Sequence, residues 1–254
     1  MKYSKLITIG FLPIMWVIYF LFELITGKIK SYNHIIGNIL LIILFAFIGY
    51  LIYWISTKFP EGITIKQAIS TFSFLMLIDQ GIKIIIKSFY FNKYFNIIGN
   101  FLSFSPIINS EGSWLNARFG AGISFTILNI INIVALFFFF ELYRYFLSKN
   151  KKSFFNDMCF LFIFSGALCS LIDKLFYGGS LDFIGISNLF IADIKDIYIN
   201  IGLLFFLVAI YNGGYLTTND DSKLNDDFKS ILSFLCFIKQ DLFKLKRKGS
   251  DISK

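Results

Sequence analysis

Charged residues and histidine are scarce in this sequence of 254 residues. Asp, Glu, Lys and Arg make up 16% of it and hydrophobic residues 56%, whereas about 25% of a soluble protein is charged. A mean hydropathy of +0.70 agrees with this, so the composition excludes a soluble globular protein. The only histidine, His34, excludes catalytic triads built on histidine and metal sites that need two histidines.

Cysteine is also rare, and the three present do not have the spacing of a metal site or a disulfide framework. We therefore expect no metal and no cofactor. If the protein is an enzyme, its chemistry must come from Asp, Glu, Lys, Ser or Tyr.

Long hydrophobic runs dominate what is present. About 20 apolar residues in a helix cross the roughly 30 Å hydrocarbon core of a bilayer. We predict an all-α polytopic membrane protein with about six transmembrane helices and a small, β-like outer segment between spans three and four, where 97–108 is strand-like. The predicted spans are 6–25, 35–55, 64–86, 123–147, 157–176 and 196–216.

The distribution of Lys and Arg predicts the orientation. The net charge of +8 raises the possibility of a nucleic-acid partner, but in so apolar a chain it is better explained by basic residues retained on the cytoplasmic side. We expect a multi-pass membrane protein with both termini in the cytoplasm, and no nucleic-acid partner. The basic tail has apolar residues at helical spacing, which predicts an amphipathic helix, either in the inner-leaflet interface or docked on the protein's own loops.

Ionisable residues gather at the outer ends of three spans. Such groups cost about 2.5 to 3.5 kcal/mol each near the centre of a membrane helix and are retained mainly where they pair or act. Gly166, Ser170 and Asp173 share one helical stripe, which should face protein. Asp182, expected in a short loop, can approach Asp196 at the start of span six. The full set is Asp79, Lys83, Asp173, Lys174, Asp182, Asp193, Lys195 and Asp196.

Two neighbouring carboxylates without histidine can share a proton, one acting as general base on water and the other as general acid. The same cluster is also compatible with an ion or substrate path through a transporter, or with structural charge pairing. These three readings remain open on spacing alone.

At these residues the sequence resembles the bacterial lipoprotein signal peptidase (signal peptidase II) family. The family's D-Q-x-x-K stretch matches 79–83, and its G-x-L-G-N-L-I-D-R block followed by Asp-Phe-Ile matches 166–174 and 182–184. Its last motif, F-N-x-A-D followed by Gly, fits 193–196 with Gly202.

The resemblance implies an intramembrane aspartic endopeptidase that cleaves diacylglyceryl-modified prolipoproteins just before the lipidated Cys, in contact with membrane lipids. Carried over, the catalytic pair is Asp182 and Asp196, at the outer face of the bacterial plasma membrane. The oligomeric state is left open. The implied substrate-binding residues are Asp79, Lys83, Asn109, Gly166, Ser170, Asp173, Lys174 and Asp193.

Several positions depart from the family pattern. Ser170 replaces Asn, Lys174 replaces Arg, Asp193 replaces Asn and Lys195 replaces Ala. The extra carboxylate leaves open whether Asp193 or Asp196 is the second catalytic acid. Amines beside the pair could hold both aspartates ionised, which keeps two alternatives: a catalytically altered homologue that binds lipid-modified peptides, or a small proton-coupled transporter.

The expected organisation has three parts. Residues 1–62 hold two N-terminal transmembrane helices, 63–216 form a core like signal peptidase II, and 217–254 form the basic cytoplasmic tail.

Overall fold

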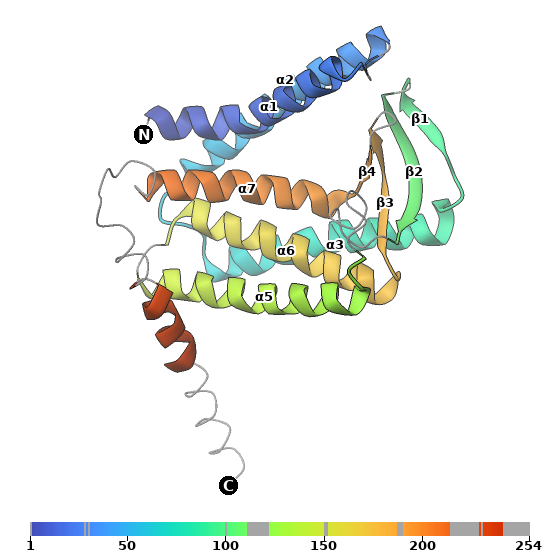
Figure 1. Ribbon diagram of the computed structural model, residues 1–254. Helices are drawn as coiled ribbons and strands as arrows, with labels where there is room; N and C mark the ends of the chain where they lie inside the picture. The colour runs from blue at the N-terminus through green and yellow to red at the C-terminus, as the bar shows by residue number, and fades with distance from the viewer. Residues whose placement is uncertain are drawn as a thin grey trace.

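Six long helices form a bundle, with a small sheet at one end of it (Figure 1). All six are long and apolar enough to cross a membrane, which confirms the predicted polytopic membrane protein. They are α1 Lys2–Ile25, α2 Tyr32–Ser56, α3 Ile65–Ile85, α5 Phe125–Ser148, α6 Phe154–Phe176 and α7 Ile194–Asn212. This computed structural model describes residues 2–27, 29, 31–99, 101–110, 122–149, 152–186, 190–213, 229 and 231–240.

Hydroxyl side chains fix where several helices begin. Thr64 caps α3 in a reciprocal capping box with Gln67, and Ser153 caps α6 by accepting from the amide of Asn156. Such caps satisfy amides that have no partner within the helix. Within the described residues α7 ends at Asn212 with Gly213 as its C-cap, and the last three residues of the predicted span, 214–216, lie outside the described residues.

The sheet combines two segments that are distant in the sequence. Strands β1 Phe95–Ile98 and β2 Leu102–Asn109 confirm the strand-like region between spans three and four. Strands β3 Ser180–Ile186 and β4 Phe190–Ala192, between α6 and α7, complete an antiparallel sheet in the order β1-β2-β3-β4.

The loop expected around Asp182 was wrong, because this residue lies on β3, opposite Ile107 of β2. A short segment with a neighbouring strand to pair with satisfies its backbone polar groups as a strand.

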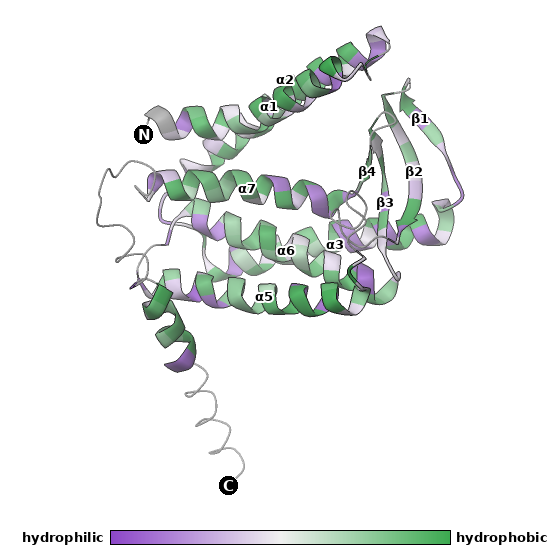
Figure 2. Cartoon of the chain, in the orientation of Figure 1, coloured by the Kyte–Doolittle hydropathy of each residue, from purple (hydrophilic) through white to green (hydrophobic). Residues whose placement is uncertain are grey.

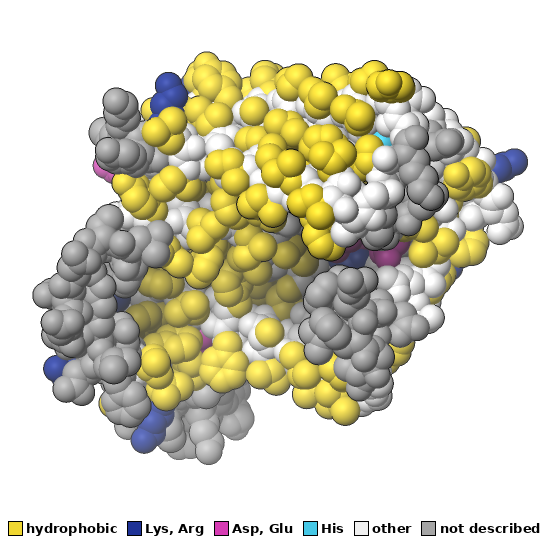
Figure 3. All heavy atoms as spheres, turned by 45° about the horizontal axis from the view of Figure 1, so that its top comes forward, with side chains coloured by type: hydrophobic (Ala, Val, Ile, Leu, Met, Phe, Trp, Pro, Cys, Tyr) yellow, Lys and Arg dark blue, Asp and Glu magenta, His cyan; other side chains and the backbone are white. Residues whose placement is uncertain are grey.

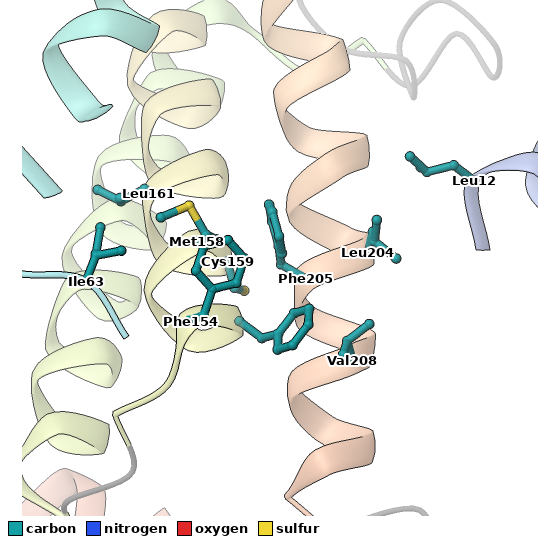
Figure 4. Close-up of a cluster of buried hydrophobic side chains, with 10 residues drawn as sticks. Leu12, Ile63, Phe154, Met158, Cys159, Leu161, Leu204, Phe205 and Val208 are labelled. Atoms are coloured by element: carbon teal, nitrogen blue, oxygen red, sulfur yellow. The ribbon is translucent and has the colours of Figure 1, made fainter. Parts of the chain in front are cut away.

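The main hydrophobic core lies between α6, α7 and α1 (Figure 4). Phe154 and Met158 of α6 meet Phe205 of α7, and Leu204 and Val208 are fully buried. Because the sheet follows the end of α6 and precedes α7, this core occupies the half of the two helices away from the sheet. The packed half anchors the helices, and their other ends are left for polar residues.

The hydropathy pattern agrees with a membrane position. Hydrophobic residues cover most of the length of the helices, and hydrophilic ones gather toward their ends and around the sheet (Figure 2). Large apolar side chains such as Ile43 of α2 and Ile131 of α5 are exposed, at 60% and 55%. Exposure of this kind suits contact with lipid rather than water.

The two N-terminal helices contact the sheet as well as α7. The ring of Tyr19 in α1 lies edge-on to Phe190 of β4, with centroids 6.0 Å apart. Phe101, which precedes β2, covers Gly37 of α2 so closely that a Cβ there would lie 2.4 Å from its ring. The β1–β2 turn and the start of β4 therefore rest on the α1–α2 hairpin.

A short apolar helix, Ile231–Gln240, packs on the end of α5 that is far from the sheet. The hydroxyl of Tyr145 donates to Ser233 at 2.9 Å, and its ring contacts Phe237. Ile231 and Leu235 remain exposed, at 56% and 48%. This part of the tail is docked on the protein, while an interfacial position for it stays a prediction. The basic end of the predicted tail helix lies outside the described residues.

Candidate functional site

Three aspartates meet where the sheet joins the helix bundle. Asp182 comes from β3, Asp193 directly precedes α7, and Asp196 lies in the first turn of α7. One carboxylate oxygen from each lies within 4.8 Å of the other two. We call these three residues the aspartate cluster. In Figure 3, acidic and basic side chains appear at one end of a hollow whose walls are otherwise hydrophobic.

Asp182 is held by hydrogen bonds to both of its oxygens. The Ser180 hydroxyl donates to Oδ1, and the Asn109 side-chain amide donates to Oδ2 at 3.1 Å. Ser180 precedes Asp182 by two residues and so lies on the same face of β3. Burial raises the pKa of the Asp182 carboxyl above its ordinary value, while Ser180, Lys195 and Asn109 oppose that rise.

Asp193 and Asp196 form a capping box at the start of α7. Asp193 Oδ1 accepts from the Asp196 amide at 3.2 Å, and Asp196 Oδ2 accepts from the Asp193 amide at 3.1 Å. Asp193 also binds two ammonium groups, Lys83 at 2.6 Å and Lys195. Burial acts to raise the pKa of Asp193, but the two lysines outweigh it and hold that pKa below its ordinary value.

Buried ion pairs lie beneath the cluster. The Lys83 ammonium contacts Asp79 at 2.9 Å and Asp173 at 2.6 Å, and all three side chains are fully buried. Gln80 donates to both carboxylates. A buried charge is tolerated only when it is paired, so these residues fasten α3 to α6 and to the start of α7. With no accessible surface, Asp79, Lys83 and Asp173 do not face an incoming substrate in this structure.

Gly166, Ser170 and Lys174 lie on α6 beside the cluster. A Cβ on Gly166 would approach Ile199 Cγ1 to 2.9 Å and the Lys195 carbonyl oxygen to 3.2 Å, so glycine lets α7 lie close to α6. Lys174 donates to the Ser170 hydroxyl at 2.7 Å. Both of these side chains are partly exposed, as is Asn109. These three polar groups can reach a ligand beside the cluster.

The sequence placed Lys195 in the ionisable set and as a departure from the family pattern, but not among the site residues, and Ser180 was not noted at all. The Lys195 ammonium donates to Ser180, pairs with Asp193 and lies 3.3 Å from Asp173 and 3.8 Å from Asp182. A hydroxyl two residues before a candidate catalytic Asp was an available signal for Ser180. The position of Lys195 depends on the close packing of α6 and α7.

The geometry suits a shared water. Two carboxylate oxygens that each lie about 2.8 Å from one water oxygen can be as much as about 5.6 Å apart. The 4.8 Å spacing of the cluster falls inside that limit. Within the cluster, Asp193 is the member that already binds two lysines and the Asp196 amide.

The same spacing also fits oxygen ligands of a cation. Ca²⁺ and Mg²⁺ prefer such ligands, but the Lys83 and Lys195 ammonium groups already neutralise Asp193. The expectation that no metal is used stays a prediction.

Comparison with known proteins gives one family. The family model described as signal peptidase (SPase) II matches residues 71–212. A lipoprotein signal peptidase of Staphylococcus haemolyticus (strain JCSC1435) is 28% identical over 144 residues, which is 54% of this chain and 85% of that protein. One from Staphylococcus aureus (strain Newman) is 28% identical over 143 residues, 54% of this chain and 83% of the relative.

A solved structure described as "Bacterial membrane enzyme structure by the in meso method at 2.3 A resolution" is similar at 25% identity and a TM-score of 0.49, covering 65% of this chain and 99% of that one. The family match spans more than half of the chain and includes all three members of the aspartate cluster. The chain belongs to the signal peptidase II family.

Proposed function

We propose that this protein is an aspartic endopeptidase of the membrane that cleaves diacylglyceryl-modified prolipoproteins just before the lipidated Cys. The observation that carries the proposal is the approach of Asp182 and Asp196 oxygens to within 4.8 Å, with Asp193 occupied by lysines. The single histidine, His34, also supports chemistry by carboxylates. It lies at the start of α2, an element that supplies no member of the aspartate cluster.

Hydrolysis by this pair needs one ionised and one protonated carboxyl. Asp182 receives hydrogen bonds at both oxygens, which favours its ionised form and makes it the base. Asp182 takes a proton from the water as the water oxygen attacks the scissile carbonyl carbon, and Asp196 donates its proton to the carbonyl oxygen. As the tetrahedral intermediate collapses, Asp196 recovers that proton, the peptide C–N bond breaks and Asp182 donates its proton to the leaving amine.

The polar residues around the pair have separate roles in this proposal. Asn109, Ser170 and Lys174 are partly exposed and orient the substrate backbone. Gly166 admits close helix packing, and Asp79, Lys83, Asp173 and Asp193 hold the site together from below. The hydrophobic hollow beside the charged residues in Figure 3 is where the apolar part of a lipid-modified substrate would lie.

We also propose that both termini are cytoplasmic and that the site opens at the outer face. The start of α1 and the helix Ile231–Gln240 lie at the end of the bundle opposite the sheet (Figure 1), and Lys and Arg are more frequent on the side assigned to the termini. Two reporters fused after residue 254 test this orientation: one is active only in the cytoplasm and the other only outside the cell. The cytoplasmic reporter should be active, and activity of the outside reporter alone contradicts the orientation.

One observation favours a catalytically altered homologue. The Lys195 ammonium lies 3.8 Å from Asp182 and could keep both aspartates ionised, which would remove the shared proton. Cleavage by the wild-type protein, lost on substitution of either aspartate, argues against that alternative.

The test in cells uses Asp182→Asn and Asp196→Asn in a strain that depends on this chain for lipoprotein processing. General acid–base catalysis contributes about 10²- to 10⁴-fold, so each variant should accumulate full-length diacylated prolipoprotein while membrane levels of the protein stay at those of wild type. Undiminished processing in both variants would overturn the assignment.

A further inference from the structure

Lys195 is the second residue of α7 and is buried, with 6% of its surface exposed. It lies among partners from three elements: Ser180 and Asp182 of β3, Asp173 of α6, and Asp193 before α7. We propose that Lys195 is a positioning residue that, through Ser180 and by its own charge, holds Asp182 ionised and directed at the water. This inference rests on the proposed function.

The hydrogen bonds run in one direction. Lys195 has only donors, so the Ser180 oxygen must accept from it, and the single hydroxyl proton of Ser180 then goes to Asp182 Oδ1. Asn109 holds Oδ2 from the other side. Asp182 therefore has a fixed orientation. The two hydrogen bonds in series, from Lys195 to Ser180 and from Ser180 to Asp182, polarise one another and stabilise the ionised carboxylate.

Other charged groups face Lys195 from every element around it. From α3 come Lys83 and Asp79, and from α6 come Asp173 and Lys174. Lys83 is divided between Asp79, Asp173 and Asp193, and Lys174 donates to Ser170. Among the described residues, Lys195 supplies the ion pair of Asp182. Asp196 lies on the same helix turn as Lys195, and its carboxylate is directed to the Asp193 amide.

A Ser–Lys catalytic dyad would give a different reading of the same contact. A lysine that removes a proton from serine must be neutral. Lys195 pairs with Asp193 and lies 3.3 Å from Asp173, and opposite charges this close keep an amine protonated. Ser180 therefore transmits the lysine's influence and is not a nucleophile.

The consequence is a pH profile set by Lys195. Burial raises the pKa of the Asp182 carboxyl, and Ser180, Lys195 and Asn109 work against burial. Without the Lys195 charge that pKa rises further, and a higher pH is needed to ionise the base. The acidic limb of kcat/KM should move upward, because that limb reports the free enzyme's base.

The experiment measures kcat/KM from acid to mild alkali for purified full-length protein and a diacylated lipobox peptide, in wild type, Lys195→Ala, Lys195→Arg and Ser180→Ala. We expect the acidic limb of the Ala variant to shift up by about one pH unit or more, and that of Lys195→Arg to stay with wild type. Ser180→Ala should lose part of the rate and shift in the same direction. Lys87→Ala is the matched control, since Lys87 stacks on Tyr177 and should leave the profile unchanged.

An acidic limb that does not move in Lys195→Ala, while Asp182→Asn is inactive, overturns the role of Lys195 and leaves the proposed function intact. Complete loss in both Ser180→Ala and Lys195→Ala, with cleavage retained in Asp182→Asn, would instead indicate a Ser–Lys dyad. Infrared titration of the protonated carboxyl band, assigned by its absence in Asp182→Asn, gives a readout independent of cleavage. Titration of that band at the same pH in wild type and Lys195→Ala would overturn the proposal even in an inactive protein.

Discussion

At the level of single residues, Asp193 and Asp196 lie three positions apart in the sequence but make different contacts. Asp193 binds Lys83, Lys195 and the amide of Asp196, whereas Asp196 is partly exposed and lies beside Asp182. The motif spacing left the second catalytic acid open between them. The contacts support Asp196 as the acid and Asp193 as the ion that holds the start of α7 against α3.

Asp193→Asn tests whether Asp193 is structural while Asp196 is the catalytic acid. Asn is also a good N-cap, so the substitution removes mainly the charge facing two buried lysines. Breaking a buried pair costs about 3 to 5 kcal/mol, and in a chain of this size the unfolding temperature in detergent at pH 7 should fall by about 6 °C or more. Cleavage should fall far less than in Asp196→Asn.

The control is the pH dependence of the difference in unfolding temperature between wild type and Asp193→Asn. The pKa of Asp193 lies below its ordinary value of 3.8, so its stabilisation is present above that value and is lost as the pH falls through the folded-state pKa. The difference in unfolding temperature between wild type and Asp193→Asn should therefore narrow in acid. A difference that stays constant in acid, or cleavage lost as fully as in Asp196→Asn, contradicts these separate roles.

Sequence reasoning identified Asp182 and Asp196 because the order and spacing of their motifs can be read along the chain. It did not place Ser180 in the site or predict the partners of Lys195, because their contacts depend on how β3 turns back toward α7. Which carboxylate a lysine reaches is decided by packing, since a lysine side chain is long and flexible.

At the scale of secondary-structure elements, the site depends on how closely α7 approaches α6. Two glycines make that approach possible. A Cβ on Gly202 would lie 2.5 Å from Ile163 Cγ1, and one on Gly166 would meet Ile199 and the Lys195 carbonyl. Because Gly166 of α6 has no side chain, the first turn of α7, which carries Asp196, can lie directly against α6.

Gly166→Val should displace that turn. Because the backbone carbonyl of Lys195 cannot yield as a side chain can, overpacking here should cost about 1 to 3 kcal/mol and lower the cleavage rate by about tenfold or more. Thermal unfolding and peptide cleavage in detergent measure the two effects. The matched control is Gly81→Ala in α3, where a Cβ meets nothing within 4 Å. Equal activity in both variants contradicts this account of the α6–α7 contact.

The helices were largely predictable and the sheet only in part. Long apolar runs specify spans, and hydroxyl caps such as Thr64 and Ser153 specify where helices start. Strands β1 and β2 have a strand-like sequence, but β3 is a seven-residue segment whose pairing with β2 spans the whole of α5 and α6. Pairings between segments so distant in sequence are not visible in local patterns.

At the scale of the whole molecule, the polar site and the hydrophobic core occupy opposite ends of α6 and α7. The core holds the helices at one end, and the ion pairs of Lys83 join them at the other. The α1–α2 hairpin lies outside the matched residues 71–212, yet it contacts the β1–β2 turn through Phe101 and the start of β4 through Phe190. This hairpin therefore helps to place Asp182.

We propose that Asp182 and Asp196 hydrolyse the peptide bond before a lipidated cysteine. The most direct measurement incubates purified protein with one diacylated lipobox peptide and determines the masses of the products. We expect a released peptide that ends at the residue before the cysteine and a partner fragment that begins with the lipidated cysteine. The cleavage rate should fall by about 10²-fold or more in Asp182→Asn and in Asp196→Asn. Cleavage at another bond, or unchanged cleavage in both variants, would contradict it.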